Sequence, residues 1–236
     1  MYHSVSEDAD DPYLVTVSPD RLGRQLRWLR DRGLTGVSVG RLLRARAAGQ
    51  ARGLVGLTFD DGYADFLDQA VPLLRRYGHT ATVFALPGRL GGENAWDAEG
   101  PRKPLLTADG IRAVAAAGME VGSHGLVHRR LTGICEEGAL DAEVADSRGL
   151  LRELTGAAPE GFCYPYGALN SRALLAVRRA GYAYACAVDP GALAGRFALP
   201  RTYVGARDGS LRLRAKRFLH AARRERLMPS PGGTPQ

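Results

Sequence analysis

Short apolar runs alternate with helical patterns along most of the chain, and this alternation limits the fold more than any other feature. The runs that resemble strands are Leu54–Phe59, Ala81–Leu86, Met119–Gly122, Phe162–Tyr164 and Tyr182–Val188. The helical patterns are Ser18–Arg32, Asp65–Tyr77, Thr107–Ala117, Ala139–Thr155 and Ser171–Ala180. Strands that alternate with helices are typical of parallel sheets. We therefore expect an α/β fold, either a barrel or a doubly wound sheet.

Common nucleotide-binding and cysteine motifs are missing. The first strand is followed by no GxGxxG pattern, and GxxxxGK[ST] is also absent, which disfavours Rossmann and P-loop folds. The 3 cysteines have no CxxC spacing, so neither a disulfide framework nor a zinc finger is expected. With 236 residues, the chain can bury a large core without such crosslinks.

The net charge of +7 is unevenly distributed. The segment from Arg212 to Arg226 has seven Lys or Arg and one acid, so it carries +6 of the total. A nucleic-acid-binding domain spreads basic charge over a face of the fold, so we expect no nucleic-acid partner. We divide the chain into a main domain (1–210), a basic amphipathic helix (211–228) and a disordered tail (229–236).

The basic helix has an apolar stripe, which consists of Leu211, Ala215, Phe218, Leu219 and Ala222. We expect this stripe to pack against the main domain, with the arginines in solvent. Peripheral attachment to an anionic surface or a partner is the alternative. The chain begins with no signal-peptide pattern and has no apolar run near 20 residues, roughly the length of a membrane span. We expect a cytoplasmic protein without a transmembrane segment, unless an upstream segment is missing.

Polar side chains follow three of the expected strands at the point where each ends. They are Asp60–Asp61, the segment His124 to His128, and Tyr164–Tyr166. In parallel α/β folds the carboxyl ends of the strands meet at one edge, where active sites form. We expect these three segments to lie close together.

The histidines and the acid pair could hold a metal. His124 and His128 have an i, i+4 spacing, which on a helical turn directs both rings to one point. Two imidazoles and one carboxylate form a site for zinc or another divalent transition metal. The second aspartate could then serve as general base toward water. The alternatives are an ordinary DDG turn and a chance pair of histidines.

These motifs together resemble a known family. TFDDG, SHGLVHRRL and FCYPYG, in this order, are similar to the motifs of the polysaccharide deacetylases, the NodB-homology or carbohydrate esterase family 4 group. YHSV and LPRTYV resemble the bacterial branch that includes poly-N-acetylglucosamine deacetylases. The resemblance covers about 2–204. It implies a distorted (β/α)7 barrel and a hydrolase that removes N-acetyl groups from a GlcNAc-type saccharide.

The resemblance also implies roles for single residues. Asp60 matches the catalytic base. Asp61, His124 and His128 match the ligands of a divalent metal, for which we expect Zn²⁺, with Co²⁺ or Ni²⁺ as alternatives. Tyr166 matches the residue whose backbone N–H stabilises the oxyanion. We expect substrate contacts from the rest of that motif and from one loop aromatic residue: Tyr164, Pro165, Tyr166 and Trp96. Trp96 has the alternative role of anchoring its loop.

The chain departs from the family pattern at two places. Cys163 stands where many members have an arginine that orients the base, so the group that orients Asp60 must come from elsewhere. The late leucine–x–histidine motif, which provides the general acid, is also missing. We assign that role to His3, although a frayed terminal residue is the alternative. His79 and His220 are expected at the surface.

Two other functions remain open at this point. The same scaffold could hydrolyse a non-sugar amide or a cyclic imide, because folds and sites of this type are reused. The missing arginine could instead indicate a weakened barrel that only binds glycans. The intact set of Asp60, Asp61, His124 and His128 argues against the second alternative.

Overall fold

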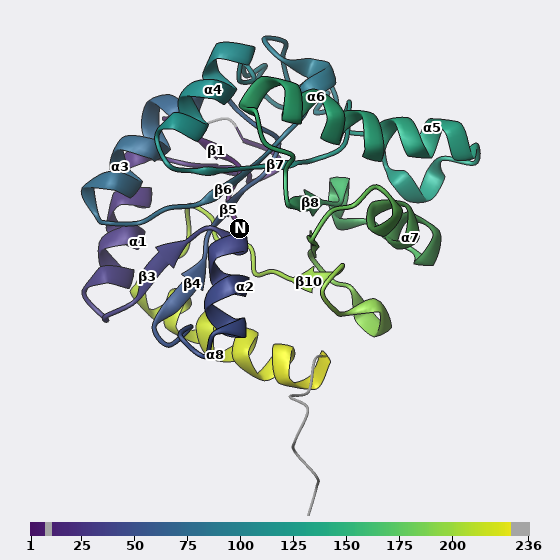
Figure 1. The fold of residues 1–236 in the computed structure, drawn as a ribbon. Coiled ribbons are helices and arrows are strands. Elements are labelled where there is room, and N and C mark those ends of the chain that lie inside the picture. The colour runs from purple at the N-terminus through teal and green to yellow at the C-terminus, as the bar shows by residue number, and fades with distance from the viewer. Residues whose placement is uncertain (8–10, 228–236) are drawn as a thin grey trace, which may run out of the picture.

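A parallel sheet curls around the centre of the molecule, and most helices lie outside it (Figure 1). The structure is a computed structural model that describes residues 1–7 and 11–227. Its strands are β1 (Ser4–Val5), β2 (Thr16–Val17), β3 (Thr35–Val37), β4 (Leu54–Gly56), β5 (Thr58–Phe59), β6 (Thr82–Ala85), β7 (Glu120–Ser123), β8 (Gly161–Cys163), β9 (Tyr184–Ala187) and β10 (Leu199–Pro200). Its α-helices are α1 (Pro19–Arg30), α2 (Val39–Ala47), α3 (Val71–Arg76), α4 (Ala108–Ala116), α5 (Glu137–Asp141), α6 (Ser147–Thr155), α7 (Ser171–Arg179) and α8 (Ser210–Leu227).

Six strands form the main sheet, in the order β10-β9-β8-β7-β6-β5, and all neighbours are parallel. The N-terminal segment closes this sheet into a barrel. At one edge of the sheet, Tyr2 forms a parallel β-bridge with Phe59 of β5. On the other side, the Met1 amine donates to Thr202 O at 2.7 Å, and Val204 N donates to Met1 O at 3.0 Å. The segment that contains β1 thus acts as a seventh strand, which confirms the predicted (β/α)7 barrel.

Several helices begin where the sequence predicts. Ser18 and Thr107 accept hydrogen bonds from the backbone N–H three residues later, and so cap α1 and α4. The helix expected over 65–77 is instead a π-helical turn, Phe66–Ala70, followed by α3. Pro72 lies at this junction and lacks the N–H that a regular helix would need.

The parallel arrangement brings the residues after four strands to one edge of the barrel. Asp60 follows β5, His124 follows β7 and Tyr164 follows β8, as predicted. Arg201 follows β10, a strand of only two residues that the sequence analysis did not find. The analysis also missed β2 and β3, because two- or three-residue strands show no periodicity. It missed the helix α2 as well.

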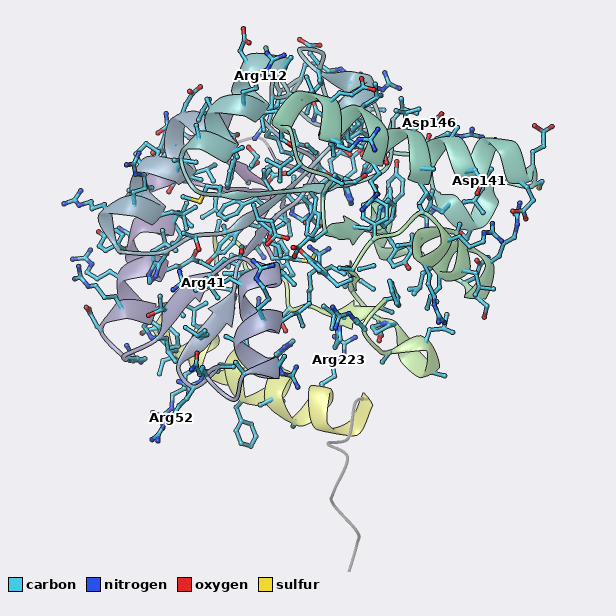
Figure 2. All side chains as sticks on the ribbon, in the orientation of Figure 1. Arg41, Arg52, Arg112, Asp141, Asp146 and Arg223 are labelled. Atoms are coloured by element: carbon cyan, nitrogen blue, oxygen red, sulfur yellow. The ribbon has the colours of Figure 1, made fainter. Side chains whose placement is uncertain are left out.

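The C-terminal helix is present, but its orientation differs from the expectation. Leu211, Phe218 and Leu219 are exposed, so the prediction that this stripe packs on the barrel is wrong. The inward face is largely polar. The tail 229–236 lies outside the described residues. Figure 2 shows other charged side chains, such as Arg52 and Asp141, at the periphery of the molecule.

Two histidines expected in solvent are also placed differently. His79 is buried, and its ring bonds to Gly36 N and Leu26 O at 3.0 Å each, so it joins β3 to α1. His220 is partly buried, with Nδ1 2.9 Å from Thr202 Oγ1. Among the described helices, none is both long enough and apolar enough to cross a membrane.

Candidate active site

Three predicted ligand atoms meet beyond the ends of β5 and β7. Asp61 Oδ1 lies 3.1 Å from His124 Nε2 and 3.4 Å from His128 Nε2. All three residues are buried, and one donor atom of each lies within 4.8 Å of the others. The expected convergence of the acid pair with the two histidines is therefore present.

The ring of His124 is oriented by a backbone group. Its Nδ1 lies 2.8 Å from Cys163 O, and a carbonyl can only accept, so Nδ1 carries the proton. Nε2 then presents a lone pair toward Asp61. Metal-bound histidines are commonly held by such a bond from the other ring nitrogen.

The segment between the two histidines is an irregular loop rather than the helical turn assumed from the i, i+4 spacing. His128 reaches the site because its backbone has φ +70°. The buried Glu143 holds the loop, since its Oε2 accepts from Leu126 N at 2.8 Å and from Val127 N at 3.2 Å. Gly125 is needed beside it, because its φ is +87° and a Cβ would lie 3.0 Å from Glu143 Oε2.

Unfavourable backbone angles concentrate at this site. Among the described residues other than glycine, four have a positive φ: Leu14, Asp61, His128 and Tyr166. Three of these four are predicted site residues. Left-handed backbone is costly for such side chains and is retained where the surrounding structure enforces it, often at functional sites.

The donor set fits a divalent cation. A carboxylate oxygen and two imidazole nitrogens are ligands that zinc and related metals bind. Burial alone would raise the pKa of Asp61, but hydrogen bonds from His124 and His128 hold it well below its usual value. When His124 is neutral, with its proton on Nδ1, it no longer donates to Asp61. Lone pairs of His124 Nε2 and Asp61 Oδ1 then face each other, and a shared cation would remove this repulsion. The residues present therefore match the metal predicted from the sequence.

Asp60 lies beside this cluster in a separate environment. Arg201 binds its carboxylate with both terminal nitrogens: Nη1 lies 2.6 Å from Oδ1 and Nη2 lies 2.7 Å from Oδ2. Both residues are buried. Burial alone would raise the pKa of Asp60, but the charge and hydrogen bonds of Arg201 lower it to about 2. Asp60 therefore stays ionised near neutral pH, and each oxygen keeps a lone pair for another proton.

Arg201 is the group that orients Asp60 in place of an arginine at position 163. Cys163 is fully buried, as expected for a small strand residue, and its Sγ lies 2.9 Å from Arg201 Nη2. Burial also raises the pKa of the Cys163 thiol. The guanidinium thus enters from the end of β10 and passes over the small side chain on β8. An arginine at position 163 would have to share this space.

His3 also reaches the site. Its Nε2 lies 4.0 Å from Asp60 Oδ2. Its buried Nδ1 has no hydrogen-bond partner among the described residues. Burial lowers the pKa of His3, although the charges of Asp61 and Asp60 oppose this effect. The ring is placed next to the predicted base, and no bond in the described structure fixes either nitrogen.

Aromatic side chains surround His128. Trp96 stacks on the His128 ring with 4.4 Å between centroids, and Tyr166 lies at 4.5 Å. Tyr166 is half exposed and carries the Arg130 guanidinium 4.6 Å above its ring. Trp96 and Tyr166 are thus at the site, as predicted. The side chain of Tyr164 does not reach the site, because it is fully buried and its hydroxyl donates to Phe197 O at 2.9 Å. We therefore correct the prediction that this side chain contacts substrate, and assign it to the packing of the core. Pro165 is buried in the turn before Tyr166.

The sequence analysis missed two residues that shape the site. Arg201 could have been found, because it follows a short apolar run and lies in the LPRTYV segment already noted. Glu143 had no such signal, since it is one of several acids in a helical pattern. Its importance depends on a contact with a loop 16 residues earlier.

Comparisons with known proteins agree with this geometry. The family described as polysaccharide deacetylase matches residues 48–185, which is more than half of the chain. The chain belongs to the polysaccharide deacetylase family. Members are hydrolases that act on carbon–nitrogen bonds other than peptide bonds, and the family resemblance seen in the motifs is confirmed.

Similar proteins cover between a third and nine tenths of this polysaccharide deacetylase chain. The putative polysaccharide deacetylase YxkH of Bacillus subtilis is 28% identical over 86% of this chain and 70% of its own. The poly-β-1,6-N-acetyl-D-glucosamine N-deacetylase of Escherichia coli is 33% identical, over 32% of this chain and 12% of its own. The Streptococcus pyogenes deacetylase PplD, solved with acetate, has a TM-score of 0.78 at 24% identity and covers 92% of this chain and 95% of its own. This last similarity supports the barrel fold.

Proposed function

We propose that residues 1–210 form a metal-dependent deacetylase that hydrolyses the N-acetyl group of a GlcNAc-type saccharide and releases acetate. One observation carries the proposal: Asp61, His124 and His128 converge on a single point, while Asp60 is held ionised beside them by Arg201. This arrangement divides two adjacent carboxylates into a ligand and a base. A partial match to a poly-β-1,6-N-acetyl-D-glucosamine N-deacetylase supports the choice of sugar.

Asp61, His124 and His128 would hold the metal. A divalent ion such as Zn²⁺ bound there supplies Lewis-acid polarisation of water and of the acetamide carbonyl. Asp60 removes a proton from the attacking water, because it is ionised and has free lone pairs. The oxygen of that water forms a bond to the carbonyl carbon, and the backbone N–H of Tyr166 donates to the resulting oxyanion.

Collapse of the tetrahedral centre breaks the carbon–nitrogen bond. The departing nitrogen needs a proton, and we assign His3 as the donor, with the proton taken up by Asp60 as its source. The distance of 4.0 Å between His3 Nε2 and Asp60 Oδ2 supports this assignment. The products are acetate, the amino sugar and one further proton. The first proton of the attacking water reaches the nitrogen through Asp60 and His3, and the second leaves the new carboxyl group for the amine or for solvent, so atoms and charge balance. The Arg201 contact argues against a weakened glycan-binding barrel, because it provides an arginine that orients Asp60.

Acetate release from N-acetylglucosamine oligomers tests the proposal. The protein is loaded with Zn²⁺ or Co²⁺, and the Asp60→Asn variant serves as control. We expect release by the wild type and a loss of about a thousandfold in the variant, the range of a general base. Metal bound by the wild type without release from any acetylated sugar would overturn the choice of substrate.

A further inference from the structure

The C-terminal helix α8 has the reverse of the usual amphipathic arrangement. A surface helix normally packs its apolar residues on the core and exposes the polar ones. In α8, Leu211 is 82% exposed, Phe218 is 74% exposed and Leu219 is 64% exposed. Single exposed apolar residues are common, but three large ones on one helix need an explanation.

Polar and charged groups hold α8 to the barrel. Lys216 Nζ donates to Tyr203 O at 2.8 Å and to Asp208 Oδ2 at 2.5 Å. One turn later, His220 Nδ1 lies 2.9 Å from Thr202 Oγ1. Arg223 reaches back from the helix to the barrel, where it donates to Val188 O at 2.9 Å (Figure 2). These contacts fix which face of α8 points outward.

The apolar packing beneath α8 is loose. A cavity of about 570 Å³ lies between this helix, α2 and β4. Two apolar residues of α8, Leu213 and Ala221, line it. Figure 1 shows α8 along this side of the barrel. Burial of Leu211 or Phe218 therefore does not hold the helix in place. Close apolar packing on the inner face of α8 does not compensate for their exposure either.

Exposed arginines surround the outward face. With about 100° between successive helical residues, Leu211 and Phe218 lie near the middle of this face and Arg214 lies close to them. Arg212 and Arg217 lie on opposite flanks, and Arg217 also borders the cavity beneath the helix. All three arginines are exposed. An apolar centre with basic flanks is the pattern of helices that lie in a membrane interface, where arginines reach the head groups.

We propose that the outward face of α8, defined by Leu211, Arg212, Arg214, Arg217, Phe218 and Leu219, docks on an anionic lipid surface. Charge favours this occupant over a second copy of the chain. The segment from Arg212 to Arg226 carries +6 of the net +7, so pairing two such helices would bring like charges together. An anionic leaflet instead attracts every basic side chain near it. The proposal is independent of the activity of the barrel.

Vesicle sedimentation tests this surface. Wild-type protein is mixed with phosphatidylcholine vesicles or with vesicles that also contain phosphatidylglycerol. We expect binding to the anionic vesicles, with weakening at high salt because charge contributes. The double variant Phe218→Ser/Leu219→Ser should reduce the partition coefficient about tenfold, as expected when two side chains that enter the membrane interface only in part are removed. Replacing Arg212, Arg214 and Arg217 by Gln should reduce it by a larger factor.

Matched controls keep the result specific. Leu175→Ser removes an exposed leucine on α7, and a triple Gln variant at Arg52, Arg75 and Arg152 removes exposed charges elsewhere. Neither control should change binding by more than about twofold, since effects away from the docking face are small. Equal loss in controls and α8 variants, or no binding to anionic vesicles, would overturn the proposal. A dimer seen by light scattering and abolished by Phe218→Ser would assign the face to a second copy instead.

Discussion

The two halves of the active site are built in different ways. The ligand half takes Asp61, His124 and His128 from two strand ends and their loops. The base half joins Asp60 to residues from both ends of the chain, His3 and Arg201, which are separated by almost its whole length. The first half depends mainly on local loop geometry, whereas the second exists only when the barrel is closed.

This difference has a chemical consequence. The ligand half brings lone pairs together and would be stabilised by the proposed metal ion, which can exchange with solvent. The base half has its cation covalently built in, as the guanidinium of Arg201, which stays charged at any ordinary pH. Substitutions in the two halves should therefore fail in distinguishable ways: loss of metal in one, and loss of turnover with metal retained in the other.

The largest effects should separate the two halves directly. His124→Ala removes a ligand, so we expect loss of tight metal binding and of activity. Asp60→Asn keeps the ligands, so metal should stay bound while kcat falls by about a thousandfold. Metal content by mass spectrometry and acetate release measure the two quantities. Equal metal loss in both variants would show that the two aspartates have been assigned to the wrong roles.

A second substitution tests how Arg201 controls the base. In Arg201→Met, burial raises the pKa of Asp60 without opposition from the guanidinium, so the pKa should rise from its present value of about 2. A base must be deprotonated to act, so the acid-side fall in kcat/KM should move to higher pH. We expect kcat to drop about a hundredfold because the carboxylate also loses its orientation. A lower kcat with an unchanged pH profile would mean that Arg201 does not set this pKa.

Glu143 provides a smaller test, confined to the ligand half. Glu143→Ala removes the acceptor for the N–H groups of Leu126 and Val127, so the His124–His128 loop should loosen. We expect metal affinity to fall by about tenfold, as for other groups that orient ligands. Glu143→Gln retains one acceptor oxygen and should recover part of this loss in a metal titration. If both variants bind metal as the wild type does, the loop does not depend on Glu143.

The smallest effect is expected at Cys163. Its thiol is buried with a raised pKa, and the backbone carbonyl, not the sulfur, orients His124. Cys163→Ser keeps a small polar group next to Arg201, so kcat/KM should change by less than about threefold. A large loss of activity in this variant, with metal bound normally, would show that the sulfur takes part in holding the Asp60–Arg201 pair.

The sequence predicted the ligand half more completely than the base half, for a physical reason. Strands of four residues and capped helices leave periodic patterns, and polar residues directly after them can be recognised. Asp61 follows the apolar run 54–59, which reads as one strand in the sequence, and His124 and His128 follow the four-residue strand β7. Arg201 follows a two-residue strand, too short to show a period, and its pairing with Asp60 depends on barrel closure.

The orientation of α8 was beyond the sequence for a related reason. Its apolar stripe was correctly recognised, but the pattern alone does not show whether the stripe packs against the protein or faces outward. The outcome was decided by tertiary partners of Lys216, His220 and Arg223, which lie in loops with no pattern of their own. Likewise, the buried position of His79 follows from the bonds it makes to β3 and α1.

The left-handed backbone at Asp61, His128 and Tyr166 would link the thermal stability of this enzyme to the proposed metal. Such conformations cost on the order of 1–3 kcal/mol each, a large part of the stability of a typical domain. A ligand that binds only the folded chain returns stability in proportion to the logarithm of its concentration. The melting temperature should therefore follow free Zn²⁺, so a chelator would act as a thermal switch as well as an inhibitor.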